Sequence, residues 1–298
     1  MNHQYDCIIV GGGIAGLQAA IQLGRYQHRT LVLDAADGRS TLCRAYNNLL
    51  GWPEGISGQQ LRESGRVHAQ RLGVTFIKAK VDQARRMEQS FVLHTNEEGG
   101  FHAKRLLIAT GVTDRIPGFS ELKPCLGISV FICPDCDGYE VKNKRTVVIG
   151  SGKTGAEMAL ELTFWTSDIV YINHEQTGIV PDKLLQLRES GISYIEAPIS
   201  RTIVEGDQFL GVELQDRGFI PFSHAFLAFG GNTVNTSLAE QLGVRILANR
   251  HIEVDPRTKM TNVQHVWAAG DVTAHSEQVA IAMGDGSQAA IWIHKSLL

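Results

Sequence analysis

The stretch YDCIIVGGGIAG, residues 5–16, decides the fold of this chain. Its apolar half ends at three consecutive glycines, and apolar residues at helical spacing continue from Ile14 to Leu23, which predicts a strand, a glycine turn and a helix. A second apolar run, Thr30–Leu33, ends at Asp34. Strand, helix and strand in this order are typical of the βαβ unit of a parallel sheet.

The glycines of this turn have the spacing of a dinucleotide-binding loop, Gly11-x-Gly13-x-x-Gly16. The first permits the tight turn, the second lets the backbone approach a pyrophosphate, and the third lets the helix pack on the strand. The phosphates then meet the free N–H groups and positive dipole end of the helix. Asp34 follows Gly16 by eighteen residues, near the ~20-residue distance at which an acidic side chain accepts ribose hydroxyls. The turn is therefore predicted to bind a dinucleotide.

The same pattern recurs in mid-chain. Residues 145–149 form an apolar run, residues 150–155 a glycine turn, residues 156–163 a helical pattern, and residues 169–172 a second apolar run. The sequence therefore predicts an α/β protein with two Rossmann-like, three-layer nucleotide-binding domains.

The residues after this second unit bear on which nucleotide it takes. Glu175 stands twenty residues beyond Gly155, within the segment His174-Glu175-Gln176. A 2′-phosphate needs an arginine nearby, whereas this segment holds no fixed positive charge and one carboxylate that would repel the phosphate. The site is expected to prefer NADH to NADPH if it binds either; a fold that has lost its nucleotide is the alternative.

The order of the remaining elements indicates that one unit is inserted in the other. An apolar run closes on Thr110-Gly111, an irregular linker follows at 113–124, and a later apolar run leads into a second crossing point at 230–232. A strand at 265–269, the turn Gly270-Asp271 and a helix from about residue 278 to 297 then resume the first unit. We expect a discontinuous first domain, 1–115 and 247–298, and an inserted domain, 116–246.

The composition argues against several classes of protein. The 298 residues carry 28 basic and 31 acidic side chains, a net charge of −3, and the length predicts about two domains. Because the charge is balanced and no run of Lys or Arg occurs, neither nucleic acid nor a membrane surface is an expected partner. The sequence has no apolar stretch of about 18 residues, and residues 1–6 lack signal-peptide features. We expect a cytoplasmic protein.

The cysteines point to redox chemistry. Cys133 and Cys136 form a C-x-x-C within the segment CPDCDG, a spacing suited to a reversible disulfide. A zinc site would need a second pair of ligands at similar spacing, so no metal is expected. Asp137, directly after the second cysteine, could protonate a leaving thiolate; a turn carboxylate is the alternative. The three isolated cysteines are expected to be small hydrophobic side chains: Cys7, Cys43 and Cys125.

Three features follow one another in a distinctive order. They are a glycine turn at the N-terminus, C-x-x-C-D-G before a second glycine turn, and Gly270-Asp271 before the last helix. The chain resembles the low-molecular-weight thioredoxin reductase family over essentially its whole length. The resemblance implies a homodimeric FAD-dependent disulfide oxidoreductase, with FAD in the split domain and the C-x-x-C in an inserted pyridine-nucleotide domain. That domain would rotate about hinges near 113–117 and 230–235.

The same resemblance implies roles for individual residues. Cys136 would lie nearer the flavin, Cys133 would attack the external disulfide, and Asp137 would be the acid. FAD would meet Gly11, Gly13, Ile14, Ala15, Gly16, Asp34, Thr110, Gly111, Gly270, Asp271, Gln278 and Val279. A pyridine nucleotide would meet Gly150, Gly152, Thr154, Gly155, His174 and Glu175. The expected partner is thioredoxin or another disulfide substrate.

The chain also departs from the family pattern. The basic segment that holds the NADPH 2′-phosphate is replaced at 174–176, the stretch after the second strand differs at 37–44, and the docking positions hold Ile128 and Tyr139-Glu140. These departures leave three alternatives open: a ferredoxin-dependent or diflavin reductase, an oxygen-dependent dithiol oxidase, and a redox-sensing flavoprotein that is not an enzyme.

Overall fold

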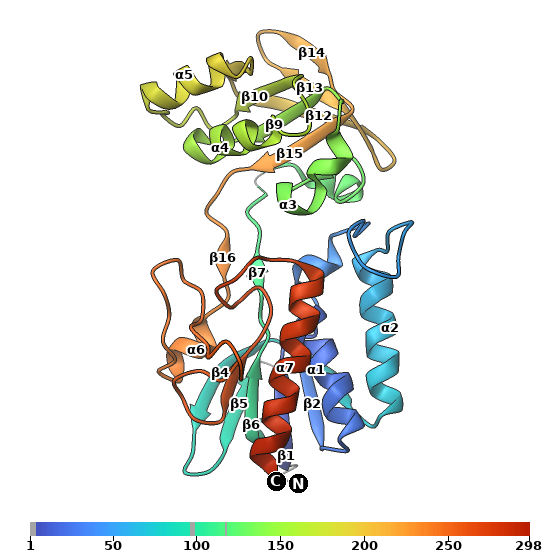
Figure 1. Cartoon of the computed structure of the whole chain (residues 1–298), viewed down its shortest axis with the longest axis vertical. Helices are drawn as coiled ribbons and strands as arrows, with labels where there is room; N and C mark the ends of the chain where they lie inside the picture. Colours follow the sequence, from blue (N-terminus) through green and yellow to red (C-terminus); the bar gives the residue numbers. More distant parts are fainter. Residues whose placement is uncertain (1–3, 96–98, 117) are drawn as a thin grey trace. The chain divides into compact units, whose positions relative to one another are not determined.

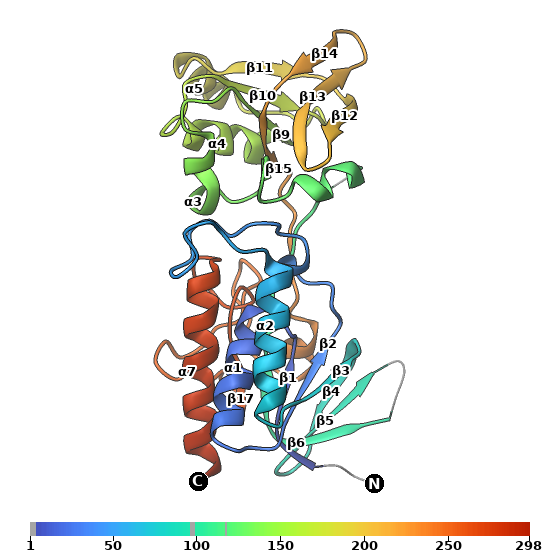
Figure 2. The same cartoon turned by 90° about the vertical axis from the view of Figure 1, so that its right-hand side faces the viewer.

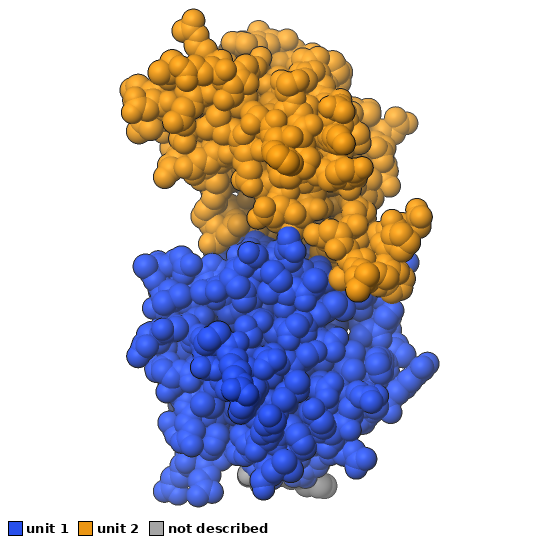
Figure 3. Space-filling view, in the orientation of Figure 1, with its two compact units in different colours: residues 1–41, 58–113, 233–298 blue, residues 42–57, 114–232 orange. Residues whose placement is uncertain are grey.

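A computed structural model describes residues 4–95, 99–116 and 118–298. The chain divides into two compact units (Figure 3). Unit 1 comprises residues 1–41, 58–113 and 233–298, and unit 2 comprises residues 42–57 and 114–232. Pro117 of the expected first hinge and the first three residues of the N-terminal segment lie outside the described residues.

Unit 1 is built on a seven-stranded sheet with the order β3-β2-β1-β6-β5-β4, in which β17 also pairs with β6 (Figures 1 and 2). β1 lies between β2 and β6 and is parallel to both. Since β1 and β2 are parallel neighbours, the chain between them must cross over, and the helix that follows the glycine turn makes this crossover. The strands are β1 (Gln4–Val10), β2 (Thr30–Asp34), β3 (Thr75–Lys78), β4 (Val81–Arg86), β5 (Phe91–Thr95), β6 (Phe101–Ile108) and β17 (Val266–Ala268).

The central part of the sheet of unit 1 is buried on both faces. Successive residues of β1 alternate between two apolar clusters, with Ile8 and Val10 in one and Cys7 and Ile9 in the other. This explains why β1 reads as a continuous apolar run. Three long helices accompany the sheet, with α1 packed against the other two (Figure 2): α1 (Ile14–Arg25), α2 (Gly58–Arg71) and α7 (Val279–Leu297); a short helix, α6 (Ser237–Gln241), packs on β4, and the 3₁₀ turn η1 spans Arg39–Thr41.

Unit 2 has a five-stranded parallel sheet with the order β11-β10-β9-β15-β8 and a separate three-stranded antiparallel sheet. The parallel strands are β8 (Val130–Phe131), β9 (Thr146–Gly150), β10 (Ile169–Asn173), β11 (Ser193–Glu196) and β15 (His224–Ala228); the antiparallel ones are β12 (Ile199–Glu205), β13 (Gln208–Leu214) and β14 (Gly218–Pro221). The helices are α3 (Pro134–Asp137), α4 (Gly152–Leu162) and α5 (Pro181–Glu189), and the 3₁₀ turns are η2 (Ser120–Cys125) and η3 (Gly138–Val141).

The α/β class expected from the sequence is confirmed, and the predicted strands and helices are present with shifted ends. The mid-chain helix begins at Gly152 instead of residue 156, since the second half of the glycine turn is already helical. The linker expected at 113–124 contains η2. No helix among the described residues is both long and apolar enough to span a bilayer.

The boundaries between the units differ from those expected at 115/116 and 246/247. The two connections are β7 (Val112–Thr113) and β16 (Thr233–Val234), which pair antiparallel within unit 1. Residues 233–246 belong to unit 1 because Leu238, Ala239 and Val244 are buried in its core. No pattern in the sequence predicts that residues 42–57 join unit 2. There, the Arg44 N–H donates to the Leu126 carbonyl at 2.8 Å.

The contact between α1 and α7 generates a first testable prediction. A Cβ added at Gly286 would lie 2.2 Å from the carbonyl oxygen of Ala15, whereas a Cβ at Gly284, on the same helix, would meet no described atom within 4 Å. We expect Gly286→Ala to destabilise the protein by about 1–3 kcal/mol through overpacking. The matched control, Gly284→Ala, should be neutral or stabilise by up to about 1 kcal/mol. Urea unfolding of both variants measures the difference; equal stabilities would contradict this account of the helix contact.

Candidate active site

The two neighbouring cysteines lie at the start of α3. Cys133 precedes the helix, and Pro134 is its first residue, where the missing N–H of proline costs no hydrogen bond. The carbonyl of Cys133 accepts hydrogen bonds from the N–H groups of Cys136, at 3.2 Å, and Asp137, at 3.0 Å. This turn brings the two Sγ atoms to within 2.6 Å of each other. A disulfide, at about 2.05 Å between sulfurs, therefore needs only a small side-chain movement.

The two thiols have different acidities. The hydrogen bond with Cys136 lowers the pKa of Cys133, although burial and the charges of Asp137 and Asp135 oppose this effect. The same hydrogen bond, together with burial, raises the pKa of Cys136. Because the thiolate is the attacking species in disulfide exchange, Cys133 is the better nucleophile of the pair.

Asp137 is the titratable carboxyl next to this dithiol. Burial, and to a smaller extent the charge of Glu140, raises the pKa of Asp137 to about 7. A carboxyl with that pKa exchanges its proton near neutral pH, which suits an acid or base in thiol chemistry. The residue following it, Gly138, is tightly packed, since an added Cβ there would lie 2.7 Å from the Trp165 ring.

The other three cysteines are not built as reactive groups. Cys7 and Cys125 are fully buried and Cys43 is partly exposed. Burial raises the pKa of all three thiols, for Cys43 to about 12. No three His, Cys, Asp or Glu side chains gather as a metal site would require within the described part of the chain.

The first glycine turn, in unit 1, leaves space in front of the helix. A Cβ added at Gly13 would meet no described atom within 4 Å, and Gly13 precedes α1, whose first N–H groups have no acceptor within the helix. The N–H of Gly12 donates to Asp34 Oδ1 at 3.1 Å. The other carboxylate oxygen of Asp34 pairs with Arg62 of α2 at 2.7 Å, and Arg62 also donates to the Gly12 carbonyl at 2.8 Å.

Two further loops of unit 1 reach the same edge of the sheet, where β6 and β17 end. Thr110 and Gly111 follow β6 and are held by Asn235: Thr110 Oγ1 donates to the Asn235 carbonyl at 2.6 Å, and the Asn235 N–H donates to the Gly111 carbonyl at 3.0 Å. The turn Gly270-Asp271 follows β17, and Asp271 accepts a hydrogen bond from Arg39 at 3.1 Å. Burial raises the pKa of Asp271, although Arg39 partly opposes this.

A buried carboxylate, Asp285 of α7, fixes the turn after β17. It accepts the Gly270 N–H at 3.2 Å and pairs with Lys259 at 2.7 Å and with His275 at 2.6 Å. Burial alone would raise the pKa of Asp285, but the hydrogen bonds from His275 and Lys259 lower it. Gln278 directly precedes α7, and Val279 is the first residue of the helix.

These residues fit a dinucleotide cofactor such as FAD. The open space at Gly13 suits a pyrophosphate against the N–H groups of α1, and Asp34 lies at the end of β2, where a carboxylate accepts ribose hydroxyls. The structure thus brings the first glycine turn, Asp34, Thr110-Gly111 and Gly270-Asp271 to one edge of unit 1. Contact of these residues, and of Gln278 and Val279, with FAD stays a prediction.

The second glycine turn, in unit 2, also follows a strand that lies between two parallel neighbours, but Thr177 covers this turn. A Cβ at Gly152 would lie 3.0 Å from Thr177 Cγ2, and Ser151 Oγ lies 2.8 Å from Thr177 Oγ1. At the end of β10 stands Asn173, whose Oδ1 accepts the Gly152 N–H at 3.0 Å. Its place corresponds to that of Asp34 in unit 1, so the strand-end residue is an amide, and Glu175 lies two residues beyond it.

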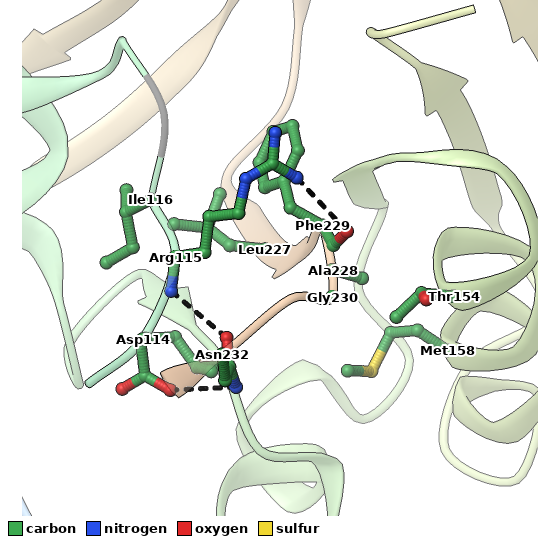
Figure 4. A pocket seen from close by; sticks show the side chains of 11 residues that line it. Asp114, Arg115, Ile116, Thr154, Met158, Leu227, Ala228, Phe229, Gly230 and Asn232 are labelled. Carbon is green, nitrogen blue, oxygen red and sulfur yellow. Dashed lines mark hydrogen bonds between the residues drawn. The ribbon is translucent and has the colours of Figure 1, made fainter. Parts of the chain in front are cut away.

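Arg115 supplies the positive charge that residues 174–176 lack. Its guanidinium pairs with the Glu175 carboxylate, with 2.5 Å between Nη2 and Oε1. Beside it, a cavity of about 110 Å³ is lined by Thr154, Met158, Phe229 and Asn232, among others (Figure 4). This volume is below the roughly 300–1,000 Å³ of typical ligand pockets.

Several residues of these sites were not predicted: Arg39, Arg62, Arg115, Asn173, Thr177 and Asp285. For Asn173 a signal existed, because it follows Gly155 by eighteen residues, the same distance that separates Asp34 from Gly16. The arginines act through partners far away in the sequence and left no local pattern.

Two nucleotide-type turns and a dithiol on a short helix define an oxidoreductase that acts on disulfides. The chain matches the model of the Pyridine nucleotide-disulphide oxidoreductase family over residues 5–286 and belongs to that family. It is 29% identical to a thioredoxin reductase of Rickettsia bellii, covering 97% of each chain, and 30% identical to a glucosaminate ammonia-lyase of Pseudomonas fluorescens, covering 95% of this chain and 93% of that protein.

Solved structures agree with these relatives. The crystal structure of HlmI superposes on all of this chain and 93% of that chain with a TM-score of 0.88, at 28% identity. The predicted class is therefore confirmed: the protein is a thioredoxin reductase-like, FAD-dependent disulfide oxidoreductase with two Rossmann-type domains. The family implies a flavin and a nicotinamide nucleotide.

The raised pKa of Asp137 generates a second prediction. If its proton goes to a leaving thiolate, disulfide reduction by the wild type should slow as pH rises above about 7. Asp137→Asn should lose this limb of the pH–rate profile and slow the reaction about 10²-fold. Asp135→Asn, the same charge change two residues earlier, is the control and should keep the limb. A limb that persists in Asp137→Asn would contradict the role.

The same carboxyl predicts how stability varies with pH. The unfolded chain releases the Asp137 proton near its ordinary pKa of 3.8, while the folded protein keeps it until about 7. Since the unfolded state then binds fewer protons, this group lowers the free energy of unfolding as pH rises from about 4 to 7. Asp137→Asn should remove that part of the decline, which urea unfolding at several pH values measures.

Proposed function

We propose that this protein reduces protein disulfides, with thioredoxin as the expected type of substrate, by passing electrons through FAD to the Cys133–Cys136 pair. The observation that carries the proposal is the approach of the Cys133 and Cys136 sulfurs to 2.6 Å beside Asp137, a carboxyl whose pKa burial raises to about 7. FAD bound at the first glycine turn and reduced by the electron donor would supply the electron pair that returns the Cys133–Cys136 disulfide to the dithiol.

The residues of α3 account for the exchange steps. The Cys133 thiolate attacks the substrate disulfide, so that a bond from Cys133 to the substrate forms as the substrate S–S bond breaks, and Asp137 protonates the leaving thiolate. The Asp137 carboxylate then takes the proton of Cys136, whose sulfur attacks Cys133. The second substrate thiol leaves and takes its proton from water. The dithiol loses two electrons and the substrate gains two.

Exposed aromatic side chains on unit 2 support a protein as the substrate. Tyr139 directly follows the CPDCDG segment and is 69% exposed, and Phe164 is 84% exposed. Phe164 stacks edge-on against Trp165, which packs at Gly138. Large exposed apolar groups near a reactive pair are typical of docking sites. A cytoplasmic homodimer remains part of the proposal, on the resemblance to thioredoxin reductases.

The electron donor in this proposal is a nicotinamide nucleotide at the second glycine turn. One observation favours a different donor: Thr177 covers Gly152, whereas the space at Gly13 is open. A reductase fed by ferredoxin, or an oxidase that passes electrons from small dithiols to oxygen, would not use that turn. Flavin bleaching by reduced ferredoxin or by dithiols, but by neither NADH nor NADPH, would favour these enzymes. A redox sensor would show a change in shape without turnover.

Cys136→Ser is the direct test of the proposed function. In anaerobic holoenzyme reduced with dithionite, we expect the wild type to reoxidise its flavin upon addition of oxidised thioredoxin, and the variant to lose this reaction, because a serine cannot close the disulfide. The control is Cys43→Ser, whose hydroxyl can keep the hydrogen bond to the Ala45 carbonyl. Flavin absorbance is the readout. Thioredoxin-dependent reoxidation that survives in Cys136→Ser would refute the mechanism.

A further inference from the structure

Arg115 and Glu175 form a two-point ion pair in unit 2. Besides the contact between Nη2 and Oε1 at 2.5 Å, Arg115 Nη1 lies 3.3 Å from Glu175 Oε2. Arg115 comes from the segment that enters unit 2, and Glu175 from the loop after β10. The pair therefore joins two segments that are sixty residues apart in the chain.

Both partners are held by other contacts. The Arg115 backbone N–H donates to Asn232 Oδ1 at 3.0 Å, and its guanidinium donates to the Phe229 carbonyl at 3.4 Å (Figure 4). Arg115 also lies 6.0 Å from the centroid of the Phe229 ring. On the other side, His174 anchors the Glu175 loop, since His174 Nδ1 accepts the Ile199 N–H at 2.9 Å. The pair is thus preorganised and not a chance encounter of two flexible side chains.

The position of the pair relative to its glycine turn repeats an arrangement of unit 1. There, Asp34 and Arg62 pair beside the first turn, where the ribose of a dinucleotide is expected. In unit 2, the strand-end residue Asn173 cannot act as that acid, because it is fully buried and both ends of its amide are bonded within the protein. Glu175 is the carboxylate two residues beyond Asn173, and the Ser151 side chain of the turn helps Arg115 to lower the pKa of Glu175.

We infer that Glu175 makes the second turn reject a 2′-phosphate by occupying Arg115, so that this site takes NAD(H) in preference to NADP(H). An arginine bound at both nitrogens by a carboxylate is not available to a phosphate, and the carboxylate itself repels one. Another cation near the turn, Lys153, is engaged one helical turn away with Glu157 at 3.5 Å. The inference rests on the proposed nicotinamide donor and names Arg115 as the specificity residue of that site.

The covering of the turn does not affect this comparison. Thr177 must be displaced from Gly152 before either nucleotide can bind, so the free-energy cost of this displacement is the same for NAD⁺ and NADP⁺. The ratio of the two dissociation constants therefore reports the effect of the charges alone.

The test measures equilibrium binding of NAD⁺ and NADP⁺ to the oxidised holoenzyme by calorimetry, which needs no turnover. We expect the wild type to bind NAD⁺ more tightly. Glu175→Gln should improve the affinity for NADP⁺ relative to NAD⁺ at least about tenfold, because it frees Arg115 for the phosphate. The double variant Glu175→Gln with Arg115→Gln should lose most of this gain. Glu213→Gln, which breaks another exposed arginine pair of unit 2, with Arg201, is the matched control and should change nothing.

Three results would overturn the inference: tighter binding of NADP⁺ by the wild type, no change of the ratio in Glu175→Gln, or an equal change in the double variant. Absence of binding of either nucleotide to every variant would also overturn it. Absence of binding would also refute the nicotinamide donor, whereas reduction of protein disulfides through Cys133 and Cys136 is judged separately by the Cys136→Ser experiment with dithionite as reductant.

Discussion

The parallel pairing of β1 with both β2 and β6 is the constraint on which unit 1 depends. The register places Val10 beside Leu33 on one side and beside Ile108 on the other. Because all three strands run in one direction, their carboxyl ends meet at one edge, where the glycine turn, Asp34 and the Thr110-Gly111 loop follow. β17, parallel to β6, brings Gly270-Asp271 to the same edge from near the end of the chain. The pairing of a few apolar strands thus brings polar residues from distant segments together at one site.

The two units use the same strand pattern with different outcomes at the turn. In unit 1 the space in front of Gly13 is open, and a carboxylate ends β2. In unit 2 a loop folds back over Gly152, and an amide ends β10. The difference arises from side chains outside the glycine pattern, above all Thr177, whose hydroxyl and carbonyl bond Ser151 and Asn173. A glycine pattern therefore specifies the backbone of a nucleotide turn, but not whether the turn is accessible.

What the sequence could predict follows from how local each signal is. Apolar runs, glycine turns and the C-x-x-C are patterns within a few residues, and the strands, helices and the α3 dithiol occur where these patterns lie. The pairs Arg62–Asp34 and Arg115–Glu175 join residues 28 and 60 positions apart, and no periodic pattern in the sequence predicts them. The same holds for residues 42–57, whose place in unit 2 depends on contacts with Leu126 and Gly127. Ion pairs between side chains could therefore be identified only from the folded structure.

The insertion of unit 2 also orders events during synthesis. All residues of unit 2 have been made once residue 232 leaves the ribosome, but unit 1 still lacks β17 and α7. α7 is the helix that packs against α1, and Trp267 of β17 is buried in the same apolar cluster. Until β17 and α7 emerge, β1 and α1 are left with apolar surface that has no partner. Unit 1 begins first but is completed after unit 2, so the edge of its sheet that is expected to bind the cofactor cannot assemble before β17 and α7 have been made.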